Sequence, residues 1–258
     1  MSDQNYFPDV TLLITHYNRS SSLERLLTTF RDLKMKFKEI IVSDDGSKAE
    51  NINKIKNLQS SFTFTLITTP QNKGLGNNIN KGLQKTDSPL ILYVQEDFYP
   101  QPEFKKAFND ALSILKERDD LDIARFYAYF KYPFLKPIRD GFSEMNFGLW
   151  KKGYRKFYMY SDHPHLRRNN FTEKFGKYHE GIKGDATEYN MMMSFLQKKG
   201  KGIFYDNFKQ LFTQYNPQDE PSTMTRDKLR NSENLFISLI RDLYRHLKFN
   251  MDYHFKKL

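Results

Sequence analysis

The chain has 258 residues, of which 38% are hydrophobic and 28% are charged, and it contains no cysteine. This length accommodates one large α/β domain or two small ones. The lack of cysteine excludes disulfides, thiolate nucleophiles and cysteine-based zinc sites. The net charge of +10 favours a polyanionic partner, which leaves nucleic acid, anionic lipid headgroups and phosphorylated small molecules open.

Targeting signals are absent from the sequence pattern. No apolar run approaches the roughly 20 residues that a membrane-spanning helix needs, and the start MSDQNYFPDV lacks the basic and apolar regions of a signal peptide. With a mean hydropathy of -0.74, we expect a soluble, cytoplasmic protein.

Strand and helix patterns alternate over the first hundred residues. Four apolar runs predict strands, at Val10–Thr15, Lys38–Ser43, Thr63–Thr68 and Leu90–Val94. Helical spacing between them predicts helices near Ser21–Leu33, Ala49–Gln59 and Leu75–Gln84, with N-caps for the first among Ser20 to Ser22. This alternation predicts a parallel sheet with helices on both faces and a ligand site beyond the carboxyl ends of its strands.

Three of these strands end in unusual polar residues. The first runs into Thr15-His16-Tyr17-Asn18, the second into Asp44-Asp45-Gly46-Ser47, and the fourth into Gln95-Glu96-Asp97. Each cluster alone is typical of turns and caps. Because the carboxyl ends of parallel strands meet at one edge, the three together predict a common site.

The second half gives weaker patterns. A helix is predicted over Pro102–Lys116 and a strand over Asp122–Phe130, followed by an aromatic and basic region from Phe142 to Gly184. The tail from Thr225 to Leu258 predicts one or two helices with an apolar stripe: Leu229, Leu235, Phe236, Leu239, Ile240, Leu243 and Leu247. Such a basic amphipathic helix rests on an anionic membrane or, more commonly, packs on its own domain or a partner.

Three blocks carry a resemblance to a known family: TLLITHYNRSSSLERLLTTF, KEIIVSDDGSKAEN and NKGLGNNINKGLQKTDSPLILYVQEDF. Over about Val10 to Phe104 they resemble the nucleotide-binding half of the family-2 inverting glycosyltransferases. The resemblance implies a GT-A fold, a Rossmann-like and mainly parallel α/β sheet flanked by helices. The implied domains are a catalytic domain over 1–215, with a nucleotide-sugar-binding half (1–102) and an acceptor half (103–215), and a basic helical extension over 216–258.

The resemblance also implies roles at the donor site. Thr15 and Tyr17 would hold the nucleotide base and Asp45 would accept a hydrogen bond from it, whereas Asp44 would organise the turn. The full implied nucleotide-binding set is Thr15, Tyr17, Asn18, Asp45, Lys73, Gly74, Asn80 and Glu96. The family commonly has an arginine where Ile79 stands, so one diphosphate contact would be either missing or supplied by Lys73.

The acids after the fourth strand match the family's Asp-x-Asp motif. By resemblance, Asp97 would bind Mn²⁺ or Mg²⁺ at the donor diphosphate, because these hard cations prefer carboxylate and phosphate oxygens. Gln95 departs from the motif and brings no charge, which predicts either weak metal affinity or a dispensable metal. The alternative is that Glu96 and Asp97 only terminate a strand.

The segment KGDATEYNMMMSFLQKKGKGIFY resembles the family's late acidic motif. An inverting transfer needs a carboxylate as general base for the acceptor hydroxyl, and Glu188 is the first choice and Asp185 the second. Both also fit the role of helix-start acids. For the acceptor we expect His163, His165, Arg167 and Arg168, since cations pair with phosphate. The same region suits single-stranded nucleic acid or a solvated basic loop.

The expected function is transfer of one sugar, with inversion, from a nucleotide diphosphate donor to a glycan or lipid-linked hydroxyl in bacterial surface polysaccharide synthesis. A UDP-linked donor is expected. One alternative is a catalytically inactive relative that binds nucleotide-sugars. The other is a nucleic-acid-binding protein. Because the second alternative leaves the acids at the strand ends unexplained, no nucleic acid is expected as a partner. Peripheral contact with the inner face of the membrane through the C-terminal helix is one further option.

Overall fold

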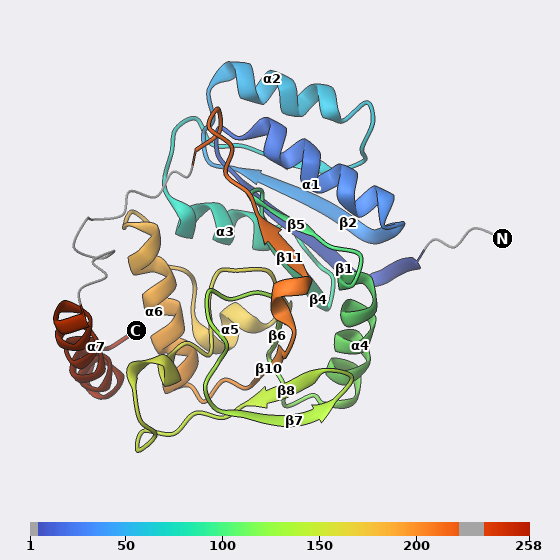
Figure 1. Ribbon diagram of the computed structural model, residues 1–258. Helices are drawn as coiled ribbons and strands as arrows, with labels where there is room; N and C mark the ends of the chain where they lie inside the picture. Colours follow the sequence, from blue (N-terminus) through green and yellow to red (C-terminus); the bar gives the residue numbers. More distant parts are fainter. Residues whose placement is uncertain (1–4, 222–234) are drawn as a thin grey trace.

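The computed structural model describes residues 5–221 and 235–258. This part of the chain forms a large sheet with helices on both faces and a helix at one side near the C-terminus (Figure 1). Residues 225–234 of the predicted C-terminal helices lie outside the described residues.

The elements alternate regularly at first and become short afterwards. The strands are β1 (Asn5–His16), β2 (Met35–Asp44), β3 (Thr65–Ile67), β4 (Leu90–Gln95), β5 (Phe98–Pro100), β6 (Ile123–Arg125), β7 (Leu135–Arg139), β8 (Phe142–Met145), β9 (His165–Arg168), β10 (Gly202–Tyr205) and β11 (Phe212–Gln214). The helices are α1 (Ser20–Asp32), α2 (Ala49–Leu58), α3 (Leu75–Leu83), α4 (Phe104–Glu117), α5 (Phe171–Phe175), α6 (Gly184–Gln197) and α7 (Leu235–Phe255), with short 3-10 helices η1 (Tyr154–Phe157) and η2 (Phe208–Gln210).

The main sheet has nine strands in the order β3-β2-β1-β4-β9-β6-β10-β8-β7. The first four run parallel to one another. Strand β9 is antiparallel to both of its neighbours, β4 and β6, and therefore joins the parallel half to the remainder. Strands β5 and β11 form a separate antiparallel pair. The predicted parallel sheet is confirmed for the first half of the chain.

Each face of the sheet carries its own apolar core. Side chains of β1 alternate between them, since Leu12 and Ile14 join one cluster and Leu13 joins the other. Helices α1, α2 and α4 cover the first face, and α3, α5, α6 and α7 contribute to the second. The carboxyl ends of β1, β2 and β4 lie at one edge of the parallel half, where the chain leaves each strand before the next element begins.

The predicted elements of the first half are confirmed with small shifts at their ends, whereas the second half differs more. The strand predicted over Asp122–Phe130 is regular only at β6 (Ile123–Arg125), and β7, β8 and β9 were not predicted. These strands are three to five residues long, and β7 is mostly exposed with the sequence LKPIR. Such segments are too short and too polar to show a strand period.

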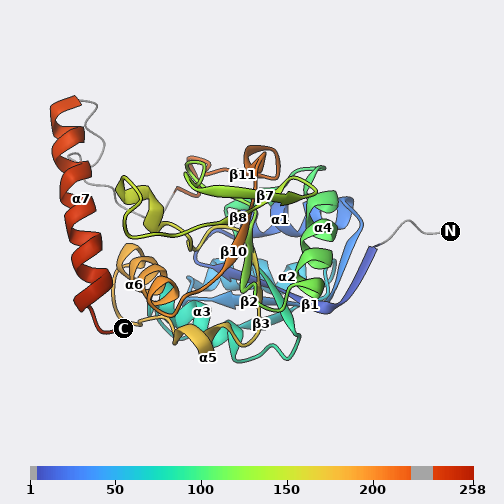
Figure 2. The same cartoon turned by 90° about the horizontal axis from the view of Figure 1, so that it is seen from below.

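The C-terminal helix α7 lies against η1 and α6, as Figure 2 shows from below. It is anchored by Phe249, whose ring meets those of Phe157 and Tyr189. The expectation that the apolar stripe packs on its own domain is wrong where the side chains are described, because Leu239, Ile240, Leu243 and Leu247 are exposed. Among the described residues, no helix is long and apolar enough to cross a membrane.

Candidate active site

Three strand ends meet at one edge of the sheet, as the sequence predicted. Thr15 at the end of β1 is the register partner of Ser43 on β2 and of Gln95 on β4. The loop that holds Asp45 and the Glu96–Asp97 pair therefore flank the end of β1 on its two sides. Parallel pairing alone places these polar groups together.

The end of β1 is held rigidly to the end of β2. His16 Nδ1 lies 2.8 Å from Asp44 Oδ1, and Asp44 Oδ2 accepts from the main chain of Gly46 and Ser47 at 3.1 and 3.0 Å. Although burial opposes it, hydrogen bonds from His16 and Ser47 lower the pKa of Asp44. Asp44 thus organises the turn, as predicted, and stays ionised.

Two predicted nucleotide-binding residues near this turn also serve the fold. Thr15 is buried, and its hydroxyl lies 3.0 Å from the Tyr93 hydroxyl. Asn18 has a positive φ of 57°. Its amide oxygen accepts from Lys48 N at 2.8 Å. Tyr17, between them in sequence, is half-buried.

Asp45 is clamped by the loop before α3. Its two carboxylate oxygens accept hydrogen bonds from the main-chain N–H groups of Lys73 and Gly74, both at 2.9 Å. Burial nevertheless raises the pKa of Asp45, against these hydrogen bonds. Gly46, at a φ of +72°, lets the two loops touch, because a Cβ there would lie 2.4 Å from the main chain of Gln71. The loops before α2 and α3 thus form one unit around Asp45.

Asn80 braces a distant loop instead of facing open space. Its amide nitrogen donates to Tyr178 O at 2.9 Å and to Glu180 Oε1 at 2.8 Å, and its oxygen accepts from Tyr178 N at 3.0 Å. The neighbouring Lys81, which the sequence analysis did not single out, donates to Asp44 O at 2.5 Å. Lys81 brings a cation close to the Asp45 loop.

The carboxylates of Glu96 and Asp97 are buried side by side with an arginine. Arg19 Nη1 lies 3.6 Å from Glu96 Oε1 and 3.5 Å from Asp97 Oδ2. Burial, followed by the charge of Asp97, raises the pKa of Glu96 to about 7. One oxygen of Asp97, Oδ1, is buried without a hydrogen-bond partner among the described residues. An orphaned carboxylate oxygen of this kind needs a cation or a donor.

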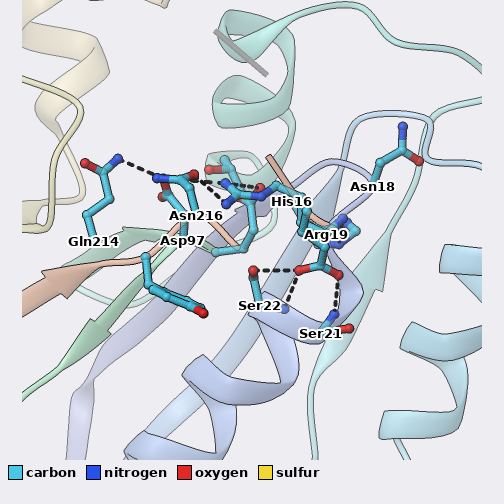
Figure 3. Close-up of polar contacts among 12 residues, drawn as sticks. His16, Asn18, Arg19, Ser21, Ser22, Asp97, Gln214 and Asn216 are labelled. Carbon is cyan, nitrogen blue, oxygen red and sulfur yellow. Dashed lines mark hydrogen bonds and ion pairs between the residues drawn. The ribbon is translucent and has the colours of Figure 1, made fainter. Parts of the chain in front are cut away.

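The segment after β11 reaches back over these acids. In Figure 3, Gln214 points to Asp97 and Asn216 points to Arg19. Gln214 Nε2 donates to Asp97 Oδ2 at 2.8 Å, and Arg19 Nη2 donates to Asn216 Oδ1 at 2.6 Å. Further on, Glu220 accepts from Ser21 N and Ser22 N, both at 2.8 Å. None of these contacts was predicted.

The Glu220 contact corrects the prediction that local serines cap α1. The helix begins at Ser20, and no side chain next to it in sequence makes a capping hydrogen bond. The cap is the Glu220 carboxylate, which arrives from the far end of the described domain. The boundary predicted between 215 and 216 stays a prediction, although the residues just after it remain bonded to the donor half.

The predicted bases lie at the start of α6, and Glu188 is held by a linking segment. Glu188 Oε1 accepts from Asp162 N at 3.2 Å, and Gln95 Nε2 donates to Asp162 O at 3.3 Å. The main chain of Asp162 therefore connects the end of β4 to Glu188. Burial, followed by the charge of Asp162, raises the pKa of Glu188 to about 8. Asp185 is half-buried in the first turn of the same helix.

The four predicted acceptor residues do not gather on one surface. His165 is buried between the rings of Tyr93 and Tyr160, and burial lowers its pKa well below its usual range. Arg167 is fully buried, and its Nη1 donates to Tyr178 OH at 2.6 Å. These two side chains are part of the interior and not of an open binding surface.

Arg168 needs a stronger correction. It pairs with Leu90 at the start of β4, so it lies at the opposite edge of the sheet from Gln95. Its guanidinium donates to the carbonyls of Leu121, Leu115 and Arg118 at 2.8, 2.6 and 3.0 Å, beyond the end of α4. Arg168 thus terminates a helix, which is why the structure does not bring it to the acids.

His163 is the predicted acceptor residue that does lie beside the acids. Its ring meets those of Phe98, Tyr127 and Tyr129 at centroid distances of 5.8, 5.3 and 4.6 Å. Tyr129 is exposed, and its hydroxyl donates to Gln214 Oε1 at 3.3 Å. The exposed Tyr129 ring is thus linked to Asp97 through one side chain, Gln214.

The carboxylates of Glu96 and Asp97 suit a hard cation, but they provide few ligands. Within residues 5–221 and 235–258, no group of three or more histidine, aspartate or glutamate side chains is placed to hold a metal ion. The Glu96 and Asp97 carboxylates, with the orphaned Asp97 oxygen, still fit a divalent ion that takes its other ligands from phosphate and water. The described residues therefore offer no protein cage, and any ion bound here would take most of its ligands from outside the protein.

Comparison with solved structures defines the class of fold. The chain is similar to Staphylococcus aureus TarS (residues 1–349, solved in complex with UDP-GlcNAc), with a TM-score of 0.60 over 97% of this chain and 76% of that one, at 15% identity. At this identity the match shows the fold alone. The predicted α/β glycosyltransferase fold, with a C-terminal helix, is confirmed.

Sequence comparison then gives the family. The model of glycosyl transferase family 2 matches residues 11–177, and the chain belongs to this family. It is 27% identical over 88 residues to the poly-beta-1,6-N-acetyl-D-glucosamine synthase of Staphylococcus aureus, covering 34% of this chain and 21% of that one. It is 25% identical over 122 residues to the cholesterol galactosyltransferase of Borreliella burgdorferi, covering 47% and 33%. The aligned region thus spans a third or less of these curated relatives.

Proposed function

We propose that this protein transfers a sugar, with inversion, from a UDP-sugar to a hydroxyl of a glycan or glycolipid acceptor in bacterial surface polysaccharide synthesis. The observation that carries the proposal is the arrangement of acids around the end of β4. The clamped Asp45 loop lies on one side, the Glu96–Asp97 pair follows the strand, and Gln95 connects the strand to Glu188. Asp45 would bind the nucleotide, the Glu96–Asp97 pair would hold the ion at the diphosphate, and Glu188 would accept the proton of the acceptor hydroxyl.

The Asp45 loop is the proposed nucleotide site. Its carboxylate oxygens each keep a free lone pair after accepting one main-chain hydrogen bond, so Asp45 can still accept from a uracil N–H. Tyr17 offers a half-buried ring nearby. The solved structure of TarS with UDP-GlcNAc supports a UDP-sugar as the donor in this fold.

Cations for the diphosphate must come from residues other than position 79. Ile79 is fully buried in the second core, so it contributes nothing to phosphate binding. Arg19, between the two acids, and Lys81, beside the Asp45 loop, are the structural substitutes, in addition to the predicted Lys73. This distribution fits a donor site in which protein cations replace part of the usual charge neutralisation.

Asp97 and Glu96 would hold Mn²⁺ or Mg²⁺. The ion, when bound, would neutralise the charge that develops on the leaving diphosphate. The neutral Gln95 donates to Asp162 O, a role that an aspartate at this position cannot fill. Gln95 therefore lacks the negative charge of the Asp-x-Asp motif, but its hydrogen bond connects β4 to the segment that holds Glu188.

Glu188 is the proposed general base. As the acceptor oxygen attacks C1 of the donor sugar, Glu188 takes the hydroxyl proton and the bond electrons leave with UDP. Attack on the face opposite the leaving group gives inversion. The raised pKa of Glu188 makes it a better proton acceptor once ionised. Asp162 holds Glu188 through its main-chain N–H and acts as a positioning residue.

The acceptor surface is proposed at Tyr129 and His163, next to Gln214. Flat rings pack on sugar faces and need no acceptor charge. The names of the relatives, a polysaccharide synthase and a cholesterol galactosyltransferase, support a glycan or glycolipid acceptor.

A thermal-shift panel tests the donor part. UDP, GDP, CDP, dTDP and their common sugar conjugates are each added with Mn²⁺ or with EDTA, because a ligand that binds the folded state raises its apparent stability. We expect a Mn²⁺-enhanced shift with UDP and a UDP-sugar. The matching UDP-sugar is then incubated with candidate acceptors and release of UDP is measured. A shift confined to another nucleotide would overturn the donor assignment.

An inactive nucleotide-sugar-binding relative is the second candidate. It is favoured by two observations, the buried Ile79 at a phosphate position and the uncharged Gln95 in the metal motif. It predicts a UDP shift that Mn²⁺ does not enhance and no release of UDP with any acceptor.

A further inference from the structure

Helix α7 has its polarity reversed relative to a helix that packs on its own domain. Its outward face is apolar and exposed, with side-chain exposures of 56 to 79% at Leu239, Ile240, Leu243, Tyr244, Leu247, Met251 and Phe255. At 100° per residue these seven positions fall within one arc of about 160°. Figure 2 shows α7 along one side of the molecule, and the high exposure of these residues means that the arc faces away from the body.

The inward face of α7 is largely polar. Lys248 pairs with Asp252, and Asp252 Oδ2 accepts from Tyr189 OH at 2.5 Å. Arg245 donates to Tyr154 OH at 3.2 Å, and the Lys256 ammonium lies 5.0 Å from the Tyr189 ring centroid. These contacts and the buried Phe249 fix the helix in one rotation, which keeps the apolar arc outside.

A basic loop with an exposed tryptophan adjoins the same helix. Tyr154 of η1 meets Phe249 at 6.1 Å, and Phe147 meets Tyr253 at 5.4 Å between ring centroids. Between Phe147 and Tyr154 lies Trp150, which is 99% exposed. Residues 148–155, GLWKKGYR, contain three cations and no acid. An exposed tryptophan among cations is the composition of an interfacial anchor.

We propose that the outward face of α7, together with the Trp150 loop, binds the surface of a lipid bilayer that contains anionic phospholipids. The apolar arc would enter the boundary between headgroups and acyl chains, while the exposed Lys257 at the edge of the arc and the exposed Lys152 of the loop reach the headgroups. Of the five lysines and arginines in residues 239–258, three make the inward contacts described above, so the cations that complement a negative surface are mainly Lys257 and those of the Trp150 loop. Binding of this face to the bilayer requires neither the nucleotide-sugar donor nor the sugar acceptor.

Charge also separates this occupant from a second copy of the chain. Two copies placed face to face through α7 would bring together two chains of net charge +10, each with the exposed cations Lys152 and Lys257 beside the apolar arc. A bilayer offers the opposite charge over the whole surface.

The location connects the membrane to the proposed reaction. Tyr189 follows Glu188 directly on α6 and contacts Asp252 and Phe249 of α7. The proposed base therefore lies on the helix that supports the membrane-facing one. A lipid-linked acceptor held at the bilayer would reach the site from this side, a step that rests on the proposed function, whereas the binding itself does not.

The test is flotation of the full chain with vesicles of phosphatidylcholine alone and with phosphatidylglycerol added. We expect binding to the anionic vesicles and little to the neutral ones. The double variant Leu243→Asp, Leu247→Asp should weaken binding at least about tenfold, because it places two charges in the apolar arc. Tyr244→Asp should weaken it less, and Tyr6→Asp is its matched control, since these tyrosines are 62% and 54% exposed.

The emission of Trp150, the single tryptophan of the chain, reports on the loop. A blue shift on anionic vesicles is expected. Absence of that shift would remove the loop from the proposal, and binding that the double variant leaves intact would overturn the role of α7. A wild-type dimer that the double variant converts to monomer, with vesicle binding unchanged, would assign the face to a second copy. If every variant retains the UDP thermal shift, a loss of vesicle binding is separate from a loss of the proposed donor binding.

Discussion

The donor edge and the acceptor half of this protein are built in different ways. At the donor edge, the candidate side chains follow the ends of parallel strands. The main chain of Lys73 and Gly74 holds Asp45, and His16 holds Asp44. In the acceptor half, Glu188 stands on helix α6, but the contact that holds its carboxylate comes from the main chain of Asp162, in an irregular segment. Repeated strand-helix units place side chains predictably, whereas irregular segments place them only through tertiary contacts.

The difference has a functional consequence. At the donor edge the backbone is set by strand pairing, and only the clamps depend on the carboxylates of Asp44 and Asp45. Variants of donor-edge residues outside these clamps should therefore lose chemistry without losing the fold. The acceptor half relies on buried polar side chains such as Arg167 and Asp162, which still have unpartnered atoms among the described residues. Its variants should therefore change both the chemistry and its pH dependence.

The largest effect is expected from Asp97→Ala. Removing the proposed metal carboxylate should abolish the Mn²⁺-dependent part of the UDP thermal shift and lower the transfer rate by about 100-fold or more, since a catalytic ion supplies several kcal/mol. Asp119→Ala, at an exposed aspartate, is the control. A UDP affinity that still responds to Mn²⁺ in Asp97→Ala is incompatible with the assignment.

Glu188→Gln should come next. It removes the proposed base but retains the shape of the side chain, so kcat should fall by about 10²- to 10⁴-fold while the UDP thermal shift is unchanged. Glu173→Gln, exposed on α5, controls for loss of a carboxylate. If Glu188→Gln keeps full activity and Asp185→Asn loses it, the base is Asp185.

The sequence was most informative where structure is local and periodic. The strands and helices of the first hundred residues, and the meeting of three polar strand ends, followed from hydrophobic spacing and parallel topology. The roles drawn from the resemblance for individual donor residues stay predictions. Thr15 and Asn80 show why, since both are occupied by contacts within the protein.

The rest depended on contacts that no local pattern announces. Arg167 and Arg168 are adjacent and both basic, but strand alternation sends one into the core and the other to the end of α4. Gln214, Asn216 and Glu220 reach Asp97, Arg19 and Ser22 across 117, 197 and 198 residues of sequence. Sequence spacing carries no signal at such separations.

Asp162→Asn should produce a smaller and more specific effect. The charge of Asp162 contributes, after burial, to the raised pKa of Glu188, so its removal should lower that pKa. Ionised Glu188 would then accumulate at lower pH, and the acidic limb of the pH–rate profile should move to lower pH. The plateau rate should change by less than about tenfold, because the main-chain N–H that holds Glu188 remains. An unmoved acidic limb, at any plateau rate, would contradict the coupling.

The smallest effect is expected at Glu220→Gln, where the two regions are joined. The Glu220 carboxylate caps α1 through Ser21 N and Ser22 N, and these hydrogen bonds, after an opposing contribution from burial, lower its pKa. A charged cap contributes about 1 kcal/mol, so Tm should fall by about 2–4 °C in a domain of this size. Glu103→Gln, at an exposed glutamate, should leave Tm unchanged.

The segment that ends in Glu220 also places Gln214 on Asp97 and Asn216 on Arg19, so loosening it should weaken UDP binding. A drop in Tm with unaltered UDP affinity would limit the segment to a structural role.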